Sequence, residues 1–482
     1  RMTTPMPGLG QRPTVFRGGL VRTADRAQPT AEALVMRGER IAYVGSEGEA
    51  LDVAGGMDSR GPRVVDLEGR VLAPGFVDPH AHPLMLGQTA SWIDCSPERT
   101  SSIAEMVDVL RSAARDLRSD RPLRGYGYQH RNLAEKRHPT RHDLDKVSQD
   151  REVYVMNASG HGGVVNSVTL TRRGITRDTP DPVGGRFGRD DGGELTGELY
   201  DAACDVLTPD DGVKLGPHGP NFHLDAPDGE LVDQLLDAER QFLRRGVTTI
   251  GDAQVSRREM RVFQLARRRG NLRARYSMFV LSHLIDELVT LGLQSGFGDD
   301  RLRLAGVKFY ADGTLGGSTA YFPEGYATDP CQHGQLYHSH DELVRLLDRA
   351  HRAGLATATH AQSPSAIEIV LDAVDAAQAA LPDGPRHRIE HAGLPLPAQV
   401  QRMARLGVTT VSQPQHYYGW GEGIVESVGP LGERYNPLGE YERSGVTWAL
   451  SSDAPVAPPD PLLAMAVAVT RRTRRRSVFA VP

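Results

Sequence analysis

Short apolar runs and helical stretches alternate along most of the chain. Eight of the apolar runs have the length and composition of strands, and they are 75–78, 246–252, 274–280, 305–310, 355–360, 388–391, 407–412 and 445–453. Amphipathic helices are expected between them, for example at 229–245, 341–353 and 364–380. Strands that alternate with helices are typical of a parallel α/β fold, and eight such units complete a TIM barrel. The pattern therefore predicts a (β/α)8 barrel.

Residues 14–70 follow a different pattern, in which short β-branched runs are broken by glycine. Strands are expected in this region at 15–21, 33–36, 41–45, 64–67 and 70–73. We therefore expect residues 1–72 to form the N-terminal part of a small β-sandwich. The first barrel strand is then expected within residues 73–84.

The expected barrel strands are unevenly spaced along the chain. The stretch between the first and second strands is far longer than a loop in a compact domain. We expect residues 85–225 to be an insertion with its own structure over the C-terminal mouth of the barrel, and residues 226–470 to complete the barrel. Residues 311–340, rich in Gly, Pro, Tyr and His, are expected to form a second long loop on the same face.

Composition narrows the class of protein. The chain has 482 residues, of which 39% are hydrophobic and 24% are charged, as expected for a globular protein. No stretch approaches the roughly 20 apolar residues of a membrane span, and no apolar signal segment stands at the N-terminus. The formal net charge of -5 gives no case for nucleic acid. We therefore expect a cytoplasmic protein that binds a small-molecule substrate, with neither nucleic acid nor a membrane as a partner.

Two local features of the composition carry no chemistry in this interpretation. The three cysteines, Cys95, Cys204 and Cys331, are far apart in the sequence and are expected to be reduced thiols. A basic run lies at 471–476, near the C-terminus. Such runs can bind polyanions, but nothing nearby supports that role, so we expect a solvated tail.

The strongest local motif is His80-Ala81-His82 at the end of the first expected strand. Residues i and i+2 on a strand point to the same side, so both imidazoles could reach one ion at about 2.0–2.1 Å. The motif by itself is equally compatible with two solvated loop histidines.

The positions of other polar residues favour a metal site over solvated loop histidines. His360, His391 and Asp453 end the fifth, sixth and eighth expected strands. Functional residues of a TIM barrel lie at these strand ends, and a polar residue that closes an apolar run is costly unless it has a partner. Four histidines and one aspartate at matching strand ends therefore predict a metal site.

Lys308, near the end of the fourth expected strand, is one of only four lysines in the chain. A buried lysine can lose its proton, whereas an arginine cannot. The neutral amine could take up CO2 and form a carbamate, whose two oxygens could bridge two cations. The alternative is a structural lysine paired with an acid such as Asp312 or Asp252.

These motifs resemble the metal-dependent amidohydrolase superfamily. The run 73–82 is similar to its opening metal motif, and 307–317, 388–392 and 451–456 resemble its amidohydrolase-3, YtcJ-like branch. Residues 160–167 match a further segment, inside the large insertion of that branch. The likeness covers about residues 14–471, and N-substituted formamide deformylase is a characterised type of enzyme in the branch.

The resemblance implies a ligand set for two divalent ions. One ion would be held by His80, His82 and Asp453, a second by His360 and His391, and carboxylated Lys308 would bridge them. Zn²⁺ is the first choice because imidazole nitrogens and carboxylate oxygens suit it, while Fe and Mn stay open. A lysine without the modification would leave a single-metal site.

The expected activity is hydrolysis of a non-peptide C–N bond, such as an amide, N-formyl or N-acyl bond, by a metal-bound hydroxide. Asp453 is expected to take the proton of the water and pass it to the leaving nitrogen. His161 is the candidate for binding the substrate carbonyl or the oxyanion. The alternatives are a cyclic-amide or imidazolone hydrolase, a deaminase or an isomerase on the same scaffold, and a non-enzymatic binding protein with a vestigial site.

Further polar and aromatic residues could line the substrate pocket. They are Gln129, His130, Asp312, His416 and Tyr417. Ordinary loop packing is an equally good explanation for each of them, and Asp312 could simply form a turn.

The chain departs from the resemblance at its C-terminal end. Relatives of this kind continue past the eighth strand with return strands to the sandwich, whereas here residues 471–482 form an arginine-rich segment. We therefore expect the sandwich to lack its C-terminal strands. An exposed sheet edge would favour association with a second copy, so a homodimer is expected.

Overall fold

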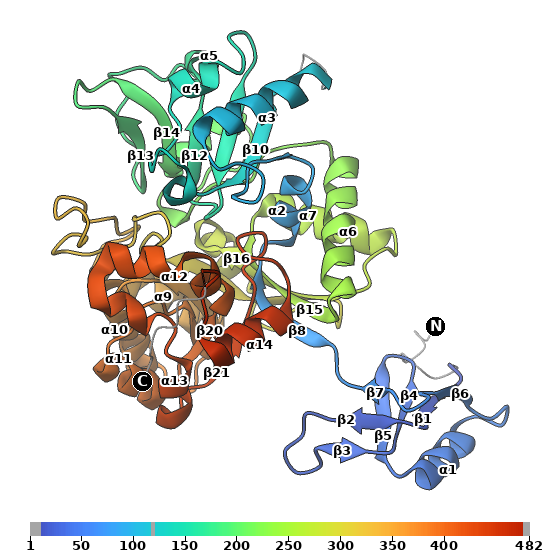
Figure 1. Cartoon of the computed structure of the whole chain (residues 1–482). Coiled ribbons are helices and arrows are strands. Elements are labelled where there is room, and N and C mark those ends of the chain that lie inside the picture. The colour runs from blue at the N-terminus through green and yellow to red at the C-terminus, as the bar shows by residue number, and fades with distance from the viewer. Residues whose placement is uncertain (1–10, 117–120, 476–482) are drawn as a thin grey trace. The chain divides into compact units, whose positions relative to one another are not determined.

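The computed structural model describes residues 11–116 and 121–475 (Figure 1). Residues 1–10 of the expected sandwich and 476–482 of the expected tail, including Arg476, lie outside the described residues. The chain divides into two compact units, Arg1–Phe76 and Val77–Pro482.

The first unit contains two small sheets and one helix. The four-stranded sheet has the order β5-β4-β1-β6, from Arg40–Gly45, Ala33–Arg37, Thr14–Arg17 and Arg63–Asp66. The three-stranded sheet has the order β3-β2-β7, from Thr30–Ala31, Leu20–Arg22 and Val71–Leu72. Helix α1 (Glu47–Met57) buries Ala50 and Ala54 against Val15 and Val35 of the larger sheet.

The prediction of one strand over 15–21 is wrong, because the run is divided between the two sheets. The reason is Gly18, whose φ of +71° is unfavourable for residues with a side chain and turns the chain between β1 and β2. Helix α1 was not expected either. It begins after Ser46, whose side chain accepts a hydrogen bond from Glu49 N, a frequent N-terminal cap.

The second unit is built around an eight-stranded parallel sheet, so the prediction of a TIM barrel is confirmed. Its order is β21-β20-β19-β18-β17-β16-β15-β8, and each expected barrel strand matches one of these. The strands are β8 (Phe76–Ala81), β15 (Val247–Val255), β16 (Arg275–Leu281), β17 (Leu302–Tyr310), β18 (Thr357–Ala361), β19 (His387–His391), β20 (Thr409–Ser412) and β21 (Trp448–Leu450).

Backbone hydrogen bonds join the two ends of this sheet. Asp453 N donates to His80 O at 2.9 Å, and His82 N donates to Ala454 O at 2.8 Å. Ser452 N also donates to the Asp78 carboxylate at 3.1 Å. The barrel therefore closes at the same residues that carry the predicted metal ligands.

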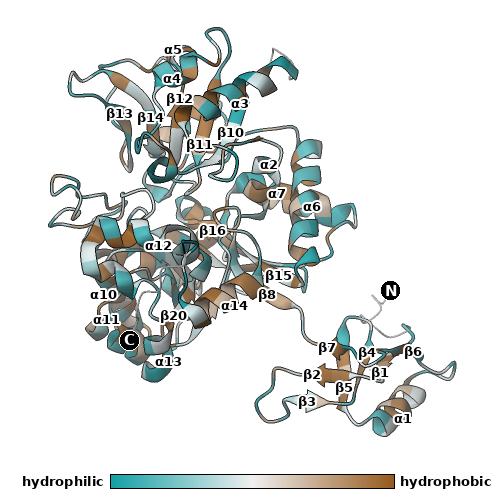
Figure 2. Ribbon diagram, in the orientation of Figure 1, coloured by the Kyte–Doolittle hydropathy of each residue, from teal (hydrophilic) through white to brown (hydrophobic). Residues whose placement is uncertain are grey.

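Helices surround the barrel with their apolar faces inward. In α9, for example, Leu343, Leu347 and Ala350 share one face and are buried. Figure 2 shows hydrophobic residues concentrated on strands such as β11, β12 and β16, and hydrophilic residues over much of α6. The helices are α2 (Pro83–Thr89), α6 (Asp228–Arg244), α7 (Arg257–Arg268), α8 (Ile285–Thr290), α9 (His340–Arg352), α10 (Pro364–Ala380), α11 (Pro397–Leu406), α12 (Pro414–Val428), α13 (Leu438–Ser444) and α14 (Pro461–Thr470).

The long segment after β8 folds around a sheet of its own. That sheet has the order β13-β14-β12-β11-β10-β9 and is mixed, with β9, β10 and β11 parallel and the others antiparallel. Its elements are β9 (Ile93–Asp94), α3 (Ile103–Asp116), β10 (Leu123–Tyr128), α4 (Arg141–Asp145), β11 (Val153–Asn157), β12 (Gly162–Val165), α5 (Ser167–Arg172), β13 (Gly185–Arg189) and β14 (Leu195–Asp201).

Two irregular segments also belong to the second unit. Residues between β17 and α9 contain no helix or strand, only the isolated pairing of Asp312 with Leu336. After α14, Arg471 donates to Tyr435 O at 2.8 Å, and its guanidinium lies 4.1 Å from the centre of the Tyr417 ring. The expectation of a solvated tail is therefore wrong for the start of the basic run, because buried carbonyl and aromatic groups bind Arg471.

Two further expectations can be compared with the described part of the chain. None of its helices has the length and apolar character needed to cross a membrane. The cysteines are free thiols, as expected, with Cys95 and Cys204 buried and Cys331 exposed.

Candidate metal centre and active site

The strand ends bring the predicted ligands to one place in the second unit. His80, Lys308, His360 and His391 lie at or near the C-terminal ends of β8, β17, β18 and β19, while His82 follows β8 and Asp453 follows β21. A small cavity is lined in part by His80, His82, His161, Tyr310, His360, His391 and Asp453. We call the six predicted ligands, His80, His82, Lys308, His360, His391 and Asp453, the strand-end centre.

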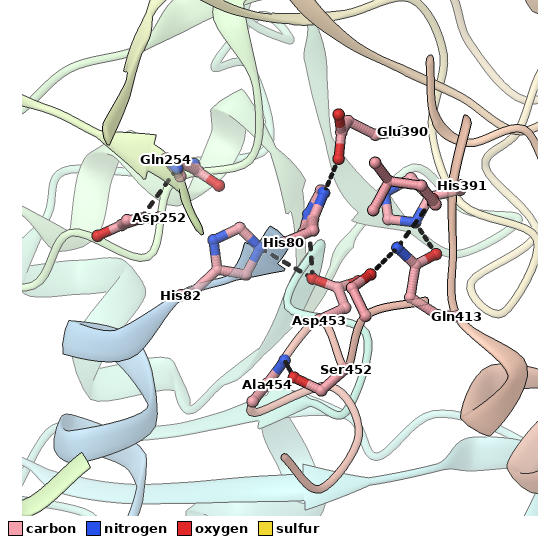
Figure 3. Close-up of polar contacts among 12 residues, drawn as sticks. His80, His82, Asp252, Gln254, Glu390, His391, Gln413, Ser452, Asp453 and Ala454 are labelled. Carbon is pink, nitrogen blue, oxygen red and sulfur yellow. Dashed lines mark hydrogen bonds and ion pairs between the residues drawn. The ribbon is translucent and has the colours of Figure 1, made fainter. Parts of the chain in front are cut away.

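Asp453 lies between two groups of imidazoles (Figure 3). Its Oδ1 lies 3.0 Å from His82 Nε2 and 3.4 Å from His80 Nε2. Its Oδ2 lies 3.5 Å from His416 Nε2, and His391 belongs to the same group. His416, predicted only as a pocket residue, therefore contacts the centre directly.

Three of the histidines predicted as ligands are each held through the ring nitrogen that faces away from the centre. His80 Nδ1 contacts Glu390 Oε2, His391 Nδ1 lies 2.6 Å from Gln413 Oε1, and His360 Nε2 lies 2.9 Å from Gly313 O. Because each oxygen accepts a hydrogen bond from a ring N–H, the other ring nitrogen is left available to a metal ion. Figure 3 shows the Glu390 and Gln413 contacts.

Sequence reasoning missed Glu390 and Gln413. Glu390 stands beside His391 in the strand, and Gln413 follows β20, so both lie at strand ends. Glu390 is fully buried and is paired with Arg388 at 2.5 Å. Burial opposes its ionisation, yet Arg388 and His80 together lower the pKa of Glu390 to about 2. A charged residue inside a strand end was the available signal.

Lys308 is fully buried, and its Nζ has no hydrogen-bond partner among the described residues. Burial lowers the pKa of Lys308 to about 8, although Glu390 and Asp453 act in the opposite direction. The alternative of a lysine paired with Asp312 finds no support, since that carboxylate accepts the backbone N–H groups of Gln362 and Ser363. The amine is thus unusually free to lose its proton.

Electrostatics favour an ionised acid among neutral imidazoles. Burial would raise the pKa of Asp453, but the adjacent His80 and His82 hold that pKa well below its usual value. Burial lowers the pKa of His82 to about 4 and takes the pKa of His360 and His391 well below the usual value. Neutral imidazoles and a carboxylate are the protonation states that a metal ion requires.

The backbone at the centre is also unusual. His391, Ala392 and Asp453 have φ values of +69°, +41° and +58°, in the left-handed region that residues with side chains rarely adopt. Such conformations cost on the order of 1–3 kcal/mol each and persist where the surrounding structure fixes them, often at functional sites. Here they direct His391 and Asp453 toward the centre.

The residues present fit a divalent ion. The set offers imidazole nitrogens and a carboxylate in a buried place, with second contacts that orient the rings, a combination typical of Zn²⁺ sites. Lys308 Nζ, which has no hydrogen-bond partner among the described residues, also fits a site that a bound group would complete.

His161 reaches the same cavity from the large insertion. It lies in the turn between β11 and β12, and its Nδ1 is 2.9 Å from Asp201 Oδ1. Its ring centre is 5.4 Å from that of His360. The predicted substrate-binding histidine therefore lies beside the centre, on an element that the barrel itself does not supply.

A larger cavity of about 820 Å³ adjoins this site. Ser159 lines both cavities, and the larger one is also bounded by Gln129, His130 and Trp420. Its volume falls within the range of about 300–1,000 Å³ typical of small-molecule sites. Two of the expected pocket residues, Gln129 and His130, therefore line a space large enough for a substrate.

Asp312 and Tyr417 line neither of these two cavities. Asp312 binds backbone N–H groups at the start of α10 and in the loop after β17. Tyr417 is buried beneath Arg471. Both residues hold neighbouring segments in place, the packing role that the sequence left open.

Comparison with known proteins gives a consistent result. A family model described as the amidohydrolase family matches residues 63–481. N-substituted formamide deformylase from Arthrobacter pascens is 30% identical, covering 94% of this chain and 82% of that protein. A putative amidohydrolase, YtcJ, from Bacillus subtilis is 28% identical over 95% of this chain and 84% of that protein.

A solved structure extends the similarity to the fold. The crystal structure of an uncharacterized metal-dependent hydrolase from Pyrococcus furiosus is 27% identical to this chain, with a TM-score of 0.71. The match covers 95% of this chain and 88% of that structure. The similarity therefore spans the barrel and the insertion together.

Proposed function

Because this chain belongs to the amidohydrolase family and is a metal-dependent hydrolase acting on C–N bonds, we propose that it cleaves a non-peptide amide, N-formyl or N-acyl bond. The single observation that carries the proposal is the convergence of His80, His82, His391 and Asp453, all buried, on one cavity. The larger cavity next to it supports a small-molecule substrate.

The six residues of the strand-end centre would hold one or two divalent ions, Zn²⁺ being the first choice. His80, His82 and Asp453 would bind one ion, and His360 and His391 a second. Lys308 would bridge them as a carbamate, which its burial and free Nζ support. When bound, such ions supply Lewis-acid activation of water and of a carbonyl group.

The side chains in and around the centre would have separate roles in the reaction. Asp453 is ionised and lies among the imidazoles, so it is the group to accept a proton from the attacking water and deliver it to the leaving nitrogen. His161 faces the cavity from the opposite segment and is the candidate for the substrate oxygen. Glu390 and Gln413 keep the ligand rings oriented.

The experiment is a substrate screen on protein loaded with Zn²⁺ or Mn²⁺. N-formyl amines, N-acyl amines, cyclic amides and carbamates are offered, and release of the amine is followed together with metal content. We expect turnover of an N-formyl or N-acyl amine that disappears when the metal is chelated and returns when it is added back. Metal-free protein as active as the loaded protein, or protein that binds no metal, would refute the proposal.

The matched control is His338→Ala. His338 is as buried as the ligands but lies outside the small cavity. His80→Ala should abolish both metal binding and turnover, while His338→Ala should leave the bound metal unchanged.

A further inference from the structure

We infer that Asp201 is a positioning residue for His161, and that the pair donates a hydrogen bond to the substrate oxygen at the metal centre. The inference rests on the proposed function and adds a role that the barrel residues do not provide. Asp201 was not among the residues expected from the sequence.

The pairing of the insertion strands places the two side chains together. β12 and β14 are antiparallel neighbours, with Gly162 opposite Tyr200, so the next pair outward is His161 and Asp201 (Figure 1). Asp201 N donates to His161 O at 2.8 Å, which extends the pairing by one residue. The contact between the imidazole and the carboxylate thus follows from the register of the sheet.

The turn before His161 sets the position of the His161 side chain. Gly160 has a φ of +74°, and Ser159 N donates to Asn157 Oδ1 at 3.0 Å. Glycine adopts this conformation without strain, so the chain can reverse between β11 and β12. Ser159, Gly160 and His161 all line the small cavity at the centre.

Asp201 is itself held on several sides. It is fully buried, and its Oδ1 accepts a hydrogen bond from Tyr337 OH at 2.5 Å as well as the contact from His161 Nδ1. Its Oδ2 accepts a hydrogen bond from Gln335 Nε2. Tyr337 and Gln335 belong to the segment between β17 and α9, so this segment and the insertion meet at one carboxylate.

The backbone conformation of Asp201 indicates that the surrounding structure holds this residue in place. Its φ of +52° and ψ of -115° lie outside the conformations that residues with a side chain ordinarily adopt. A fully buried carboxylate that accepts three hydrogen bonds can stabilise a positive charge on the ring beside it. Neither Asp201 nor Tyr337 is part of the strand-end centre, so the metal site does not account for this arrangement.

The chemistry follows from the direction of the first hydrogen bond. Asp201 accepts a hydrogen bond from Nδ1–H, so Nε2 is the ring nitrogen left for the substrate. Donation from Nε2 to the carbonyl oxygen requires a hydrogen on each ring nitrogen, and this bond would strengthen as the oxygen gains negative charge. No bond to His161 forms or breaks, and both ring protons stay on the ring.

The test combines Asp201→Asn, His161→Ala and the double variant, each loaded with Zn²⁺ and assayed on the amide identified for the wild-type protein. Asparagine keeps the shape but lacks the charge. We expect each single variant to lower kcat by about 10²–10³-fold with KM changed less than about threefold, because the contact strengthens in the transition state. The double variant should be no slower than His161→Ala alone.

Metal content separates this inference from the proposed function. Both variants should bind as much metal as the wild-type protein, since neither residue is a ligand. Wild-type protein without metal or turnover would refute the proposed function, whereas active wild-type protein with multiplicative losses in the double variant would refute only the role of Asp201. Asp190→Asn, in the exposed turn between β13 and β14, is the matched control and should leave kcat unchanged.

If Asp201→Asn does not fold, two other variants still test the inference. His161→Ala with kcat near the wild-type value would overturn the inference by itself. Tyr337→Phe removes one donor to Asp201 and a 3.4 Å contact with His161 Nδ1, but it leaves the contact between His161 and Asp201, so it should lower kcat less than Asp201→Asn does. A larger loss in Tyr337→Phe than in His161→Ala would also overturn it.

Discussion

The strand-end centre can be compared with a second buried cluster in the same barrel, formed by His223, Asp252, Arg258 and Glu259, which we call the β15 cluster. Both combine acids and bases with almost no exposed surface. In the β15 cluster, Glu259 is paired with Arg258 at 2.6 Å and accepts a hydrogen bond from Ser256 N at 3.0 Å. The charged Arg258 and Glu259 of that cluster pair with each other, whereas Asp252 Oδ2 has no hydrogen-bond partner among the described residues.

The strand-end centre does not satisfy itself in this way. Lys308 Nζ has no hydrogen-bond partner among the described residues and lies 4.6 Å from the centre of the Tyr310 ring, and several imidazoles surround the carboxylate of Asp453. Buried charged groups are stable when they are paired or bound to a metal. The difference shows that burial alone does not identify a functional site. Buried polar groups that lack partners and converge on a cavity do identify one.

The largest effect that could break this comparison is expected at Asp453. Asp453→Asn keeps the size of the side chain but removes the charge and the proton acceptor. We expect kcat to fall by about 10⁴-fold, the upper range for loss of general acid–base catalysis, with the fold retained. Turnover is measured with the amide found by the screen, and circular dichroism checks the fold. Near wild-type turnover would remove Asp453 from the mechanism.

The next prediction compares Glu390, which contacts His80 of the strand-end centre, with Glu259 of the β15 cluster. Glu390→Gln removes the charge that orients His80, and loss of such a contact weakens metal binding by about 10–100-fold. The affinity is measured by competition with a chelator. Unchanged affinity would show that Glu390 has only a packing role.

Glu259→Gln is the matched control for that experiment. It leaves Arg258 buried without its carboxylate, and breaking a buried pair costs about 3–5 kcal/mol of the free energy of unfolding. We expect a less stable protein whose metal affinity is unchanged. A loss of metal affinity in Glu259→Gln would mean that the two clusters are not independent.

A pH-dependent effect on stability is expected at Asp252, where burial raises the pKa to about 8. The folded protein therefore keeps a proton that the unfolded chain loses near pH 4, so the free energy of unfolding should decrease as pH rises from about 4 to about 8. The slope for one such group is at most about 1.4 kcal/mol per pH unit. Urea unfolding at pH 5 and pH 7 measures it.

Asp252→Asn should flatten this pH dependence, because the amide does not titrate. The outcome that would contradict the assignment is an equal decrease in stability between pH 5 and pH 7 in the variant and the wild-type protein. The strand-end centre is kept metal-free in both, so that bound metal does not mask the difference.

Particular residues show which parts of the fold could be predicted. The barrel strands are long apolar runs with helices between them, and this local periodicity predicted all eight of them. The run at 15–21 was misread because its division depends on Gly18 and on which sheet each half joins. Arg471 was expected in solvent, since nothing in the local sequence indicates that Tyr417 and Tyr435 lie beside it.

The candidate site shows the same division between local and distant information. His80, His82 and Asp453 could be predicted because the ends of parallel strands must meet at one mouth of a barrel. The role of Asp201 could not, because it depends on the register of β12 with β14. Glu390 was visible as a charged residue at a strand end, but its role depends on which ring nitrogen of His80 faces the centre. Register and ring orientation result from packing between segments that are far apart in the sequence.

The sequence by itself therefore determined the barrel, the order of its strands and the chemical types gathered at their ends. These depend on local hydrophobic periodicity and on residue identity, which are written along the chain. Only the tertiary structure decided that Lys308 has no hydrogen-bond partner within 11–116 and 121–475, that Asp453 contacts two groups of histidines, and that the insertion supplies His161 with Asp201. Those facts depend on distances and burial, which arise when the chain has folded and water has left the site.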